Sequence, residues 1–136
     1  MIIDANVAFK WLVDEELSGN AARLLPRSDL VAPTILDVEV LQALTRRFRQ
    51  RLLDRESVQL AAEGLGEAPL ERIEWSGVDD TALKLSLDLR ATYVDCLYLA
   101  LAIDLDDIMV TADQSFVRAV QSDTALGHRV RGLSEF

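Results

Sequence analysis

Short apolar runs alternate with longer stretches of helical periodicity along this sequence, and no other feature constrains the fold as strongly. The short runs predict strands of a few residues, and the longer stretches predict helices between them. Strands that alternate with helices are typical of α/β domains with a mostly parallel sheet. We therefore predict a mostly parallel central sheet flanked by helices, in a Rossmann-like fold of three layers.

The expected elements cover most of the chain. Strands are expected over residues 1–4, 30–32, 70–75, 108–111 and, at an edge of the sheet, 128–133. Helices are expected over residues 7–13, 21–25, 34–49, 55–63, 79–89, 92–105 and 114–120. Gly64 and Gly66 predict the end of the fourth helix. The stretch 92–105 is apolar on every side, which predicts a helix buried inside the domain.

Length and composition favour one domain over residues 1–136. Half of the 136 residues are hydrophobic, enough for a domain of this size to bury roughly two thirds of its unfolded surface. The single Cys96 has no partner for an internal disulfide, which is typical of a reducing compartment. No apolar run reaches the ~18 residues of a membrane span, and the first residues do not resemble a signal peptide. We expect a cytoplasmic protein.

Four acidic residues are expected at one edge of the sheet. Asp4 ends the first strand, and Asp113 lies just past the strand 108–111. The carboxyl ends of parallel strands meet at one edge, where ligands bind in open α/β sheets. Glu39 lies in the second turn of the helix that leaves strand 30–32, and Asp95 lies in the first turn of the apolar helix. These positions predict that the four carboxylates share a site.

Each acid also has a purely structural interpretation. Asp4 and Asp113 stand where helix N-caps are expected. Thr92 and Asp95 fit a variant capping box, with Asp95 bonding back to the Thr92 backbone. Glu39 has the alternative of pairing with an arginine. The four together, with no base beside them in the sequence, instead favour an all-oxygen site for Mg²⁺ or Mn²⁺.

Polar and basic residues near this edge complete the candidate site. Asn6 and Thr111 are expected either to orient the carboxylates or to serve in turns. Lys10, Arg46 and Arg47 are candidates for contact with phosphate groups, although arginines at the end of a helix also stabilise its dipole. The net charge of −9 argues against nucleic-acid binding, unless cations offset the clustered acids.

Several other chemistries lack their residues. The single His128 has no nucleophile pattern around it, and no phosphate loop, dinucleotide fingerprint or Cys/His zinc pattern is present. An aspartyl phosphohydrolase needs a second acid two residues after its nucleophile, where this chain has Asn6. A non-catalytic scaffold that binds RNA or protein stays open as an alternative.

Four segments, in order, resemble the motifs of PIN-domain ribonucleases, in particular the toxins of VapBC-type toxin–antitoxin pairs. The segments are residues 2–11 (IIDANVAFKW), Pro33 with 39–44 (EVLQAL), 95–102 (DCLYLALA) and 110–116 (VTADQSF). Two details depart from the common pattern, because Val94 stands where many members have tyrosine and Cys96 where alanine is common. Residues 115–117 also lack the further acid that some members carry, which leaves open how firmly a second metal is held.

The resemblance implies a PIN-like fold and an activity. The family's acids correspond to Asp4, Glu39, Asp95 and Asp113, with one or two Mg²⁺ or Mn²⁺ ions held by the three aspartates. The implied reaction is hydrolysis of an RNA phosphodiester, with Glu39 orienting a water or accepting its proton. Toxins of this kind usually form homodimers and are inhibited by an antitoxin protein, so both partners are expected here.

Overall fold

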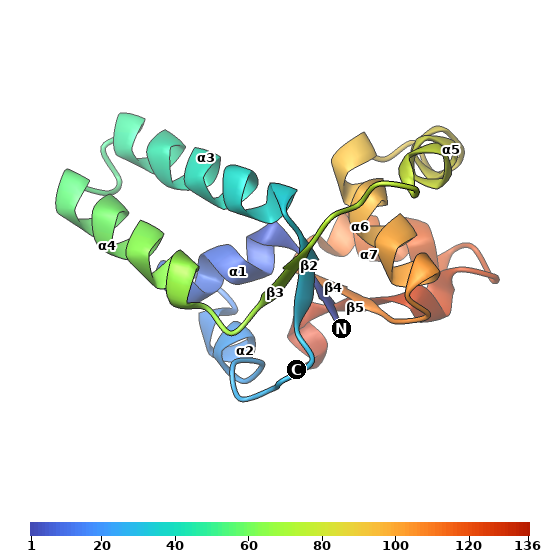
Figure 1. Ribbon diagram of the computed structural model, residues 1–136, viewed down its shortest axis with the longest axis horizontal. Coiled ribbons are helices and arrows are strands. Elements are labelled where there is room, and N and C mark those ends of the chain that lie inside the picture. The colour runs from blue at the N-terminus through green and yellow to red at the C-terminus, as the bar shows by residue number, and fades with distance from the viewer.

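Five strands form one parallel sheet in the computed structural model, which describes residues 1–136 (Figure 1). The strands are β1 (Ile2–Ile3), β2 (Val31–Pro33), β3 (Glu71–Ile73), β4 (Met109–Thr111) and β5 (Val130–Gly132). Their order across the sheet is β3-β2-β1-β4-β5, and every neighbouring pair is parallel. The α/β architecture is therefore confirmed, and the sheet is parallel throughout rather than mostly parallel.

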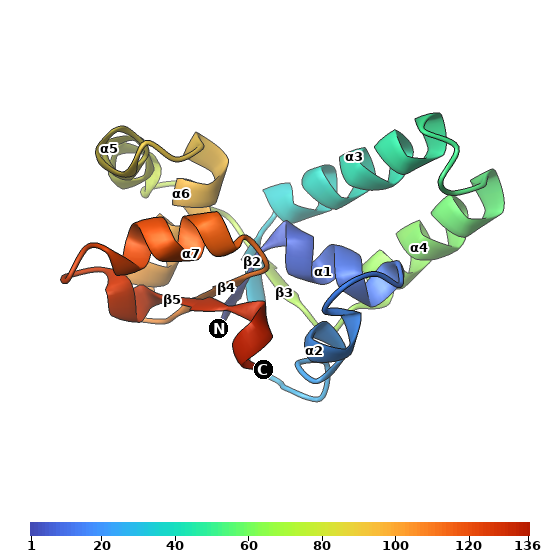
Figure 2. The same ribbon diagram turned by 180° about the vertical axis from the view of Figure 1, so that it is seen from behind.

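Seven α-helices cover the two faces of the sheet. They are α1 (Ala5–Leu12), α2 (Ser18–Ala22), α3 (Ile35–Arg49), α4 (Arg55–Glu67), α5 (Asp79–Leu89), α6 (Tyr93–Asp104) and α7 (Gln114–Gln121). Helices α1 to α4 gather on one side and α5 to α7 on the other, as Figure 1 and the reverse view in Figure 2 show. Right-handed crossovers require this separation, because the chain moves from β1 to β3 in one direction and from β3 to β5 in the other.

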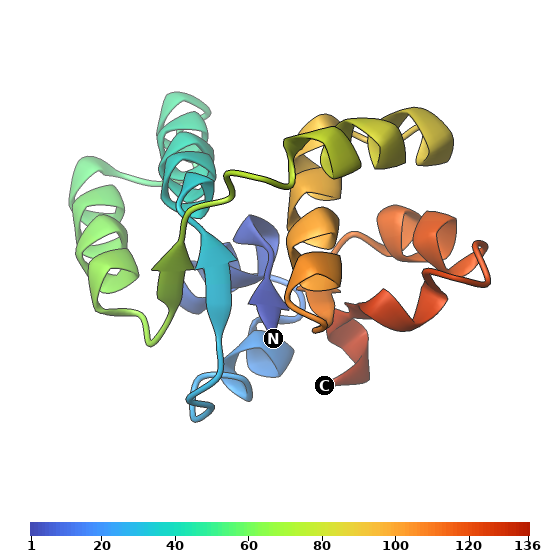
Figure 3. The same cartoon turned by 45° about the vertical axis from the view of Figure 1, so that its right-hand side comes forward.

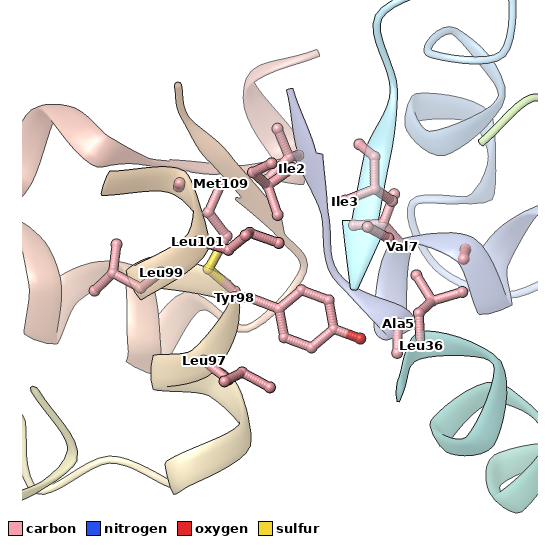
Figure 4. Close-up of a cluster of buried hydrophobic side chains, with 14 of the residues drawn as sticks. Ile2, Ile3, Ala5, Val7, Leu36, Leu97, Tyr98, Leu99, Leu101 and Met109 are labelled. Carbon is pink, nitrogen blue, oxygen red and sulfur yellow. The ribbon is translucent and has the colours of Figure 1, made fainter. Parts of the chain in front are cut away.

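Helix α6 occupies the middle of the core, as its uniform apolarity predicts. It contacts β1, β2 and β4 and packs along α5. Its residues from Cys96 to Ala102 are all buried, and Tyr98 is completely buried. Figure 4 shows Tyr98 extending from this helix toward Ala5 and Leu36, across the end of the sheet. No helix of the protein is long and apolar enough to span a membrane.

The predicted end of α4 and both predicted ends of α2, expected over residues 21–25 and observed over Ser18–Ala22, are wrong. Helix α4 continues through Gly64 to Glu67, because Leu65 is buried and the missing side chain of Gly64 allows close packing. A Cβ at Gly64 would lie 3.2 Å from Leu12 Cδ2 of α1, so this glycine serves the contact between helices rather than a helix end. Helix α2 starts at Ser18 rather than three residues later, directly after Leu17 in the left-handed conformation.

The neighbouring strands β1 and β4 mark the place in the sheet from which the connections run in opposite directions. The connection after β1 leads toward one edge of the sheet, and the connection after β4 leads toward the other. Such a switch point opens a crevice at the carboxyl ends of the two strands. The register pairs Ile3 with Val110, so Asp4 and Thr111 follow side by side. Helix α6 begins near this same edge, as Figure 3 shows.

Candidate active site

Asp4 is buried at the switch point and is held by two side chains. The Asn6 amide nitrogen (Nδ2) donates a hydrogen bond to Asp4 Oδ2 at 2.7 Å, and the Thr111 hydroxyl (Oγ1) donates to the same oxygen at 2.5 Å. Asp4 stands at the N-cap position of α1, but its side chain caps no amide of that helix. The carboxylate instead accepts from the side chains of Asn6 in that helix and Thr111 in β4.

The same hydrogen bonds connect the ends of β1 and β4. The Thr111 hydroxyl oxygen accepts from Asn6 Nδ2 at 2.9 Å and from the backbone N–H of Asp113 at 3.1 Å. Asn6 Oδ1 in turn accepts from the backbone N–H of Ala112 at 2.9 Å. Asp4 after β1, Asn6 in α1 and Thr111 at the end of β4 thus form one continuous network, and a change in any of them affects the orientation of Asp4.

Burial gives Asp4 an unusual acidity. Removal from water raises its pKa from 3.8 to about 7, and the hydrogen bond from Thr111 only partly opposes this. The negative charges of Asp95 and Glu39 contribute to the same rise to about 7. Without a bound cation, a large fraction of Asp4 is therefore protonated at neutral pH.

Glu39 reaches the site from α3 and is bonded to the buried tyrosine of α6. The Tyr98 hydroxyl donates a hydrogen bond to Glu39 Oε2 at 2.6 Å. Partial burial raises the pKa of Glu39, and the charge of Asp95 adds to this. No arginine forms an ion pair with Glu39, so that alternative is wrong. Sequence reasoning counted Tyr98 only as apolar, although a buried tyrosine hydroxyl usually finds a partner.

Asp95 combines a helix-end bond with a place in the site. Thr92 is the N-cap of α6, and its hydroxyl oxygen accepts from the backbone N–H of Asp95 at 3.2 Å. The Thr92 hydroxyl donates to Asp95 Oδ2 at 2.6 Å, so the carboxylate bonds to this side chain rather than to the Thr92 backbone. Partial burial and the charge of Asp113 raise the pKa of Asp95.

Asp113 is a helix cap with a low pKa. Its Oδ1 accepts from the backbone N–H groups of Ser115 and Phe116, at 2.8 and 3.0 Å, and from the Ser115 hydroxyl at 2.6 Å. These bonds lower the pKa of Asp113 below its usual value. The capping interpretation is therefore correct for this residue, while Oδ2 takes part in none of these bonds.

Two cavities meet at Asp95. A cavity of about 350 Å³ contains Asp4, Glu39 and Asp95, and a second cavity of about 360 Å³ contains Asp95, Asp113 and Arg90. None of the four acids forms an ion pair. No group of three or more acidic, histidine or cysteine side chains lies close enough together to hold one metal ion. The four acids therefore lie along two adjoining cavities rather than around a single point.

Two of the three basic candidates, Arg46 and Arg47, line the first cavity, and Lys10 does not. The two arginines line it together with Glu15, a residue that sequence reasoning missed. Lys10 is only 11% exposed and pairs with Glu15 at 2.5 Å, and Arg47 pairs with the same carboxylate at 2.8 Å. Glu15 lies in the loop after α1, where no periodic pattern connects it to Lys10 or to α3, so no sequence signal could have found it.

The fold and the site together define a class of protein. This is a parallel α/β protein whose topological switch point is lined with carboxylates. A family model described as PIN domain matches residues 1–121. The chain belongs to the PIN-domain family.

Known proteins agree with this assignment. Ribonuclease VapC3 of Mycobacterium tuberculosis, from strains CDC 1551 / Oshkosh and ATCC 25618 / H37Rv, is 32% identical over 128 residues. The alignment covers 93% of this chain and 92% of the relative, which confirms the resemblance to VapC-type ribonucleases. The crystal structure of PAE2754 from Pyrobaculum aerophilum has a TM-score of 0.74 at 15% sequence identity, over 98% of this chain and 83% of that chain. That likeness supports the fold.

Proposed function

We propose that this protein is a divalent-metal-dependent endoribonuclease and the toxin of a toxin–antitoxin pair. One observation carries the proposal: Asp4, Glu39, Asp95 and Asp113 line adjoining cavities at the switch point of the sheet without any ion pair. Burial makes the ionised forms of Asp4, Glu39 and Asp95 costly, as their raised pKa values show, and a bound cation removes that cost. The named ribonuclease relatives support RNA as the substrate.

The donor chemistry fits Mg²⁺ or Mn²⁺, which prefer oxygen ligands. Mg²⁺ is commonly held by one or two carboxylates and several waters, so the absence of a three-carboxylate group does not conflict with it. Asp4 and Asp95 would hold one ion, and Asp95 and Asp113 a second. A bound ion lowers the pKa of a water ligand and offsets negative charge on the phosphate.

The protein side chains supply orientation and proton transfer. Asn6 and Thr111 fix Asp4, and Tyr98 fixes one oxygen of Glu39. The raised pKa of Glu39 makes it a better proton acceptor than an exposed glutamate, and it would take the proton of the attacking water. Arg46 and Arg47 provide positive charge in the wall of the same cavity, where a neighbouring RNA phosphate would bind.

An aspartyl phosphohydrolase is the weaker candidate. Its second acid would stand at Asn6, whose amide instead holds Asp4 and Thr111. A scaffold without catalysis would have no need for all four acids.

The proposed nuclease activity is tested by incubating purified protein with structured RNA and Mn²⁺, with and without a chelator. We expect cleavage that a chelator abolishes, and we expect Asp4→Asn, Asp95→Asn and Asp113→Asn each to reduce the rate by more than about 100-fold, since loss of an outer partner of a metal ligand alone costs 10–100-fold. Asp104→Asn is the matched control, because it removes an exposed acid at the far end of α6. Cleavage in the presence of chelator, or wild-type cleavage by Asp95→Asn, would contradict the proposal.

The partners and location also follow from the proposal. The protein would be cytoplasmic and homodimeric, with a small antitoxin protein as its inhibitor. An arginine of that antitoxin would pair with carboxylates of the site. Expression of the protein alone should slow growth, and co-expression with the product of a short neighbouring gene should restore it. Normal growth with active, folded protein would contradict the toxin role but not the nuclease.

A further inference from the structure

Glu15 joins two cations at the wall of the first cavity. Its Oε1 accepts from Lys10 Nζ at 2.5 Å, and its Oε2 accepts from Arg47 Nη2 at 2.8 Å. The loop that carries Glu15 is itself fixed, because the Ser18 hydroxyl accepts from the Glu15 backbone N–H at 3.0 Å and donates to Val13 O at 3.1 Å. The carboxylate is therefore held by its backbone as well as by its two partners.

Arg47 is fixed from a second direction. Its guanidinium lies over the ring of Phe9, with 5.4 Å between the guanidinium carbon and the ring centroid. The hydrogen bond to Glu15 uses one of the five N–H donors of the guanidinium, which donates no other hydrogen bond within the chain. Both Arg47 and Phe9 line the cavity that contains Asp4 and Asp95. Arg47 thus keeps most of its donors for a ligand while its position is set.

Stability explains the bond from Lys10 to Glu15 better than the bond from Arg47. The Lys10 side chain is only 11% exposed and needs a counter-charge, whereas the Arg47 side chain is 37% exposed and gains less from the same carboxylate. The arrangement also brings two like charges, Lys10 and Arg47, to one carboxylate. A rigid guanidinium with free donors beside a proposed cleavage site is, however, well suited to a phosphate.

We propose that Glu15 is a positioning residue, which holds Arg47 at the cavity wall so that it binds an RNA phosphate next to the one that is cleaved. The inference rests on the proposed nuclease function. It extends that function by assigning a role to Glu15, a residue that itself carries the wrong charge to contact RNA.

The proposal is tested by whether one substitution, Glu15→Gln, strengthens or weakens RNA binding. In a chain with net charge −9, removing an acid near the RNA should strengthen binding if only the overall charge matters. If Glu15 positions Arg47, Glu15→Gln should instead weaken binding, because a neutral amide does not hold two cations. Glu16→Gln is the control, since it makes the same charge change at an exposed neighbour without a partner.

Binding is measured with a fluorescent single-stranded RNA oligonucleotide and full-length protein carrying Asp95→Asn, in Mg²⁺, over a range of salt concentrations. We expect Glu15→Gln to raise the dissociation constant about fivefold or more, as loss of a charge-assisted hydrogen bond does. The salt dependence should fall by about 0.7 in log–log slope, the value for one phosphate contact on a single strand. Arg47→Met should give the same change, and the double variant no further change.

Cleavage by the otherwise unmodified protein gives a second measurement. Glu15→Gln should raise KM with little change in kcat, whereas damage to the fold would lower kcat and the melting temperature. Tighter or unchanged RNA binding by Glu15→Gln overturns the positioning role while the nuclease function stands. Absence of RNA binding by the Asp95→Asn parent at low salt overturns RNA as the substrate, and the role of Glu15 with it.

Discussion

Asp4 and Asp113 occupy the same local position, but their pKa values are shifted in opposite directions. Each follows one of two neighbouring parallel strands, and each is the N-cap residue of the helix that comes next. The Asp113 side chain turns onto the amides of α7, which lowers its pKa. The Asp4 side chain caps no amide of α1 and instead joins the Asn6–Thr111 network, and burial raises its pKa to about 7.

The difference shows that a position directly after a strand does not by itself determine which groups an acidic side chain bonds. A carboxylate at a helix start normally bonds the free N–H groups there. At Asp4 two side-chain donors from the switch point compete successfully for the carboxylate. Burial of Asp4 at the switch point, more than its place before a helix, therefore keeps this acid in a state that a proton or a cation can neutralise.

The largest expected effect is on stability as a function of pH. The pKa of Asp4 in the folded protein lies above its unfolded value of 3.8. The contribution of Asp4 to the free energy of unfolding is therefore complete below pH 3.8 and is lost as the pH rises through about 7. A difference of about three pKa units corresponds to at most roughly 4 kcal/mol. Asp4→Asn should remove this loss, so the metal-free variant should be more stable than the wild type at about pH 8 and lose the advantage toward about pH 4.

Urea unfolding in chelator over this pH range provides the measurement, with Asp113→Asn as the comparison. The lowered pKa of Asp113 contributes stability that is present above 3.8 and lost only as the pH falls further. Asp113→Asn should therefore keep the wild-type slope between the two pH limits. If the two variants changed that slope equally, the contrast between the two acids would be wrong.

A smaller effect is expected when the network at Asp4 is broken. Thr111→Val keeps the size of the side chain but removes the donor to Asp4, and it leaves one N–H of the Asn6 amide and the backbone N–H of Asp113 without an acceptor. We expect the rate of RNA cleavage to fall about 10- to 100-fold, as for other partners that orient metal ligands. Thr111→Ser should restore most of the activity because it restores the hydroxyl. Equal rates for the valine variant and the wild type would remove Thr111 from the site.

The smallest effect concerns the cap at α7. Asp113→Ala should lower the free energy of unfolding by about 0.5–2 kcal/mol, because the N–H groups of Ser115 and Phe116 lose their acceptor. Asp113→Asn keeps an acceptor and should cost much less, although both variants lose the carboxylate. Thermal unfolding of the two metal-free variants separates the cap from the charge. Similar losses in both would mean that charge, not capping, holds the start of this helix.

Local patterns predicted the fold and the positions of the acids, because both depend on neighbours along the chain. Strand ends and helix starts place Asp4, Asp95 and Asp113 at one edge without any knowledge of packing. The end of α4 could not be predicted, because whether Gly64 ends the helix depends on Leu12 of α1.

Contacts between distant residues were also beyond the sequence pattern. The bond from Tyr98 to Glu39 spans 59 residues, and the pair of Arg47 with Glu15 spans 32. Lys10 was expected to reach phosphate or solvent, and the structure shows it paired with Glu15, so an RNA contact by Lys10 stays a prediction. The direction of the Asp4 side chain likewise depends on Thr111, more than a hundred residues away in the chain.

The hydroxyl of Thr111 also determines where a proton on Asp4 resides. It has a single hydrogen, and its oxygen already accepts two bonds, from Asn6 and from the Asp113 N–H. Its hydrogen must therefore point at Asp4 Oδ2, which also receives a hydrogen from Asn6. A proton on Oδ2 would face two donors, so neutral Asp4 carries its proton on Oδ1. Protonation and cation binding thus compete for one defined oxygen of Asp4, and this competition makes the protein's affinity for metal fall as the solution becomes more acidic.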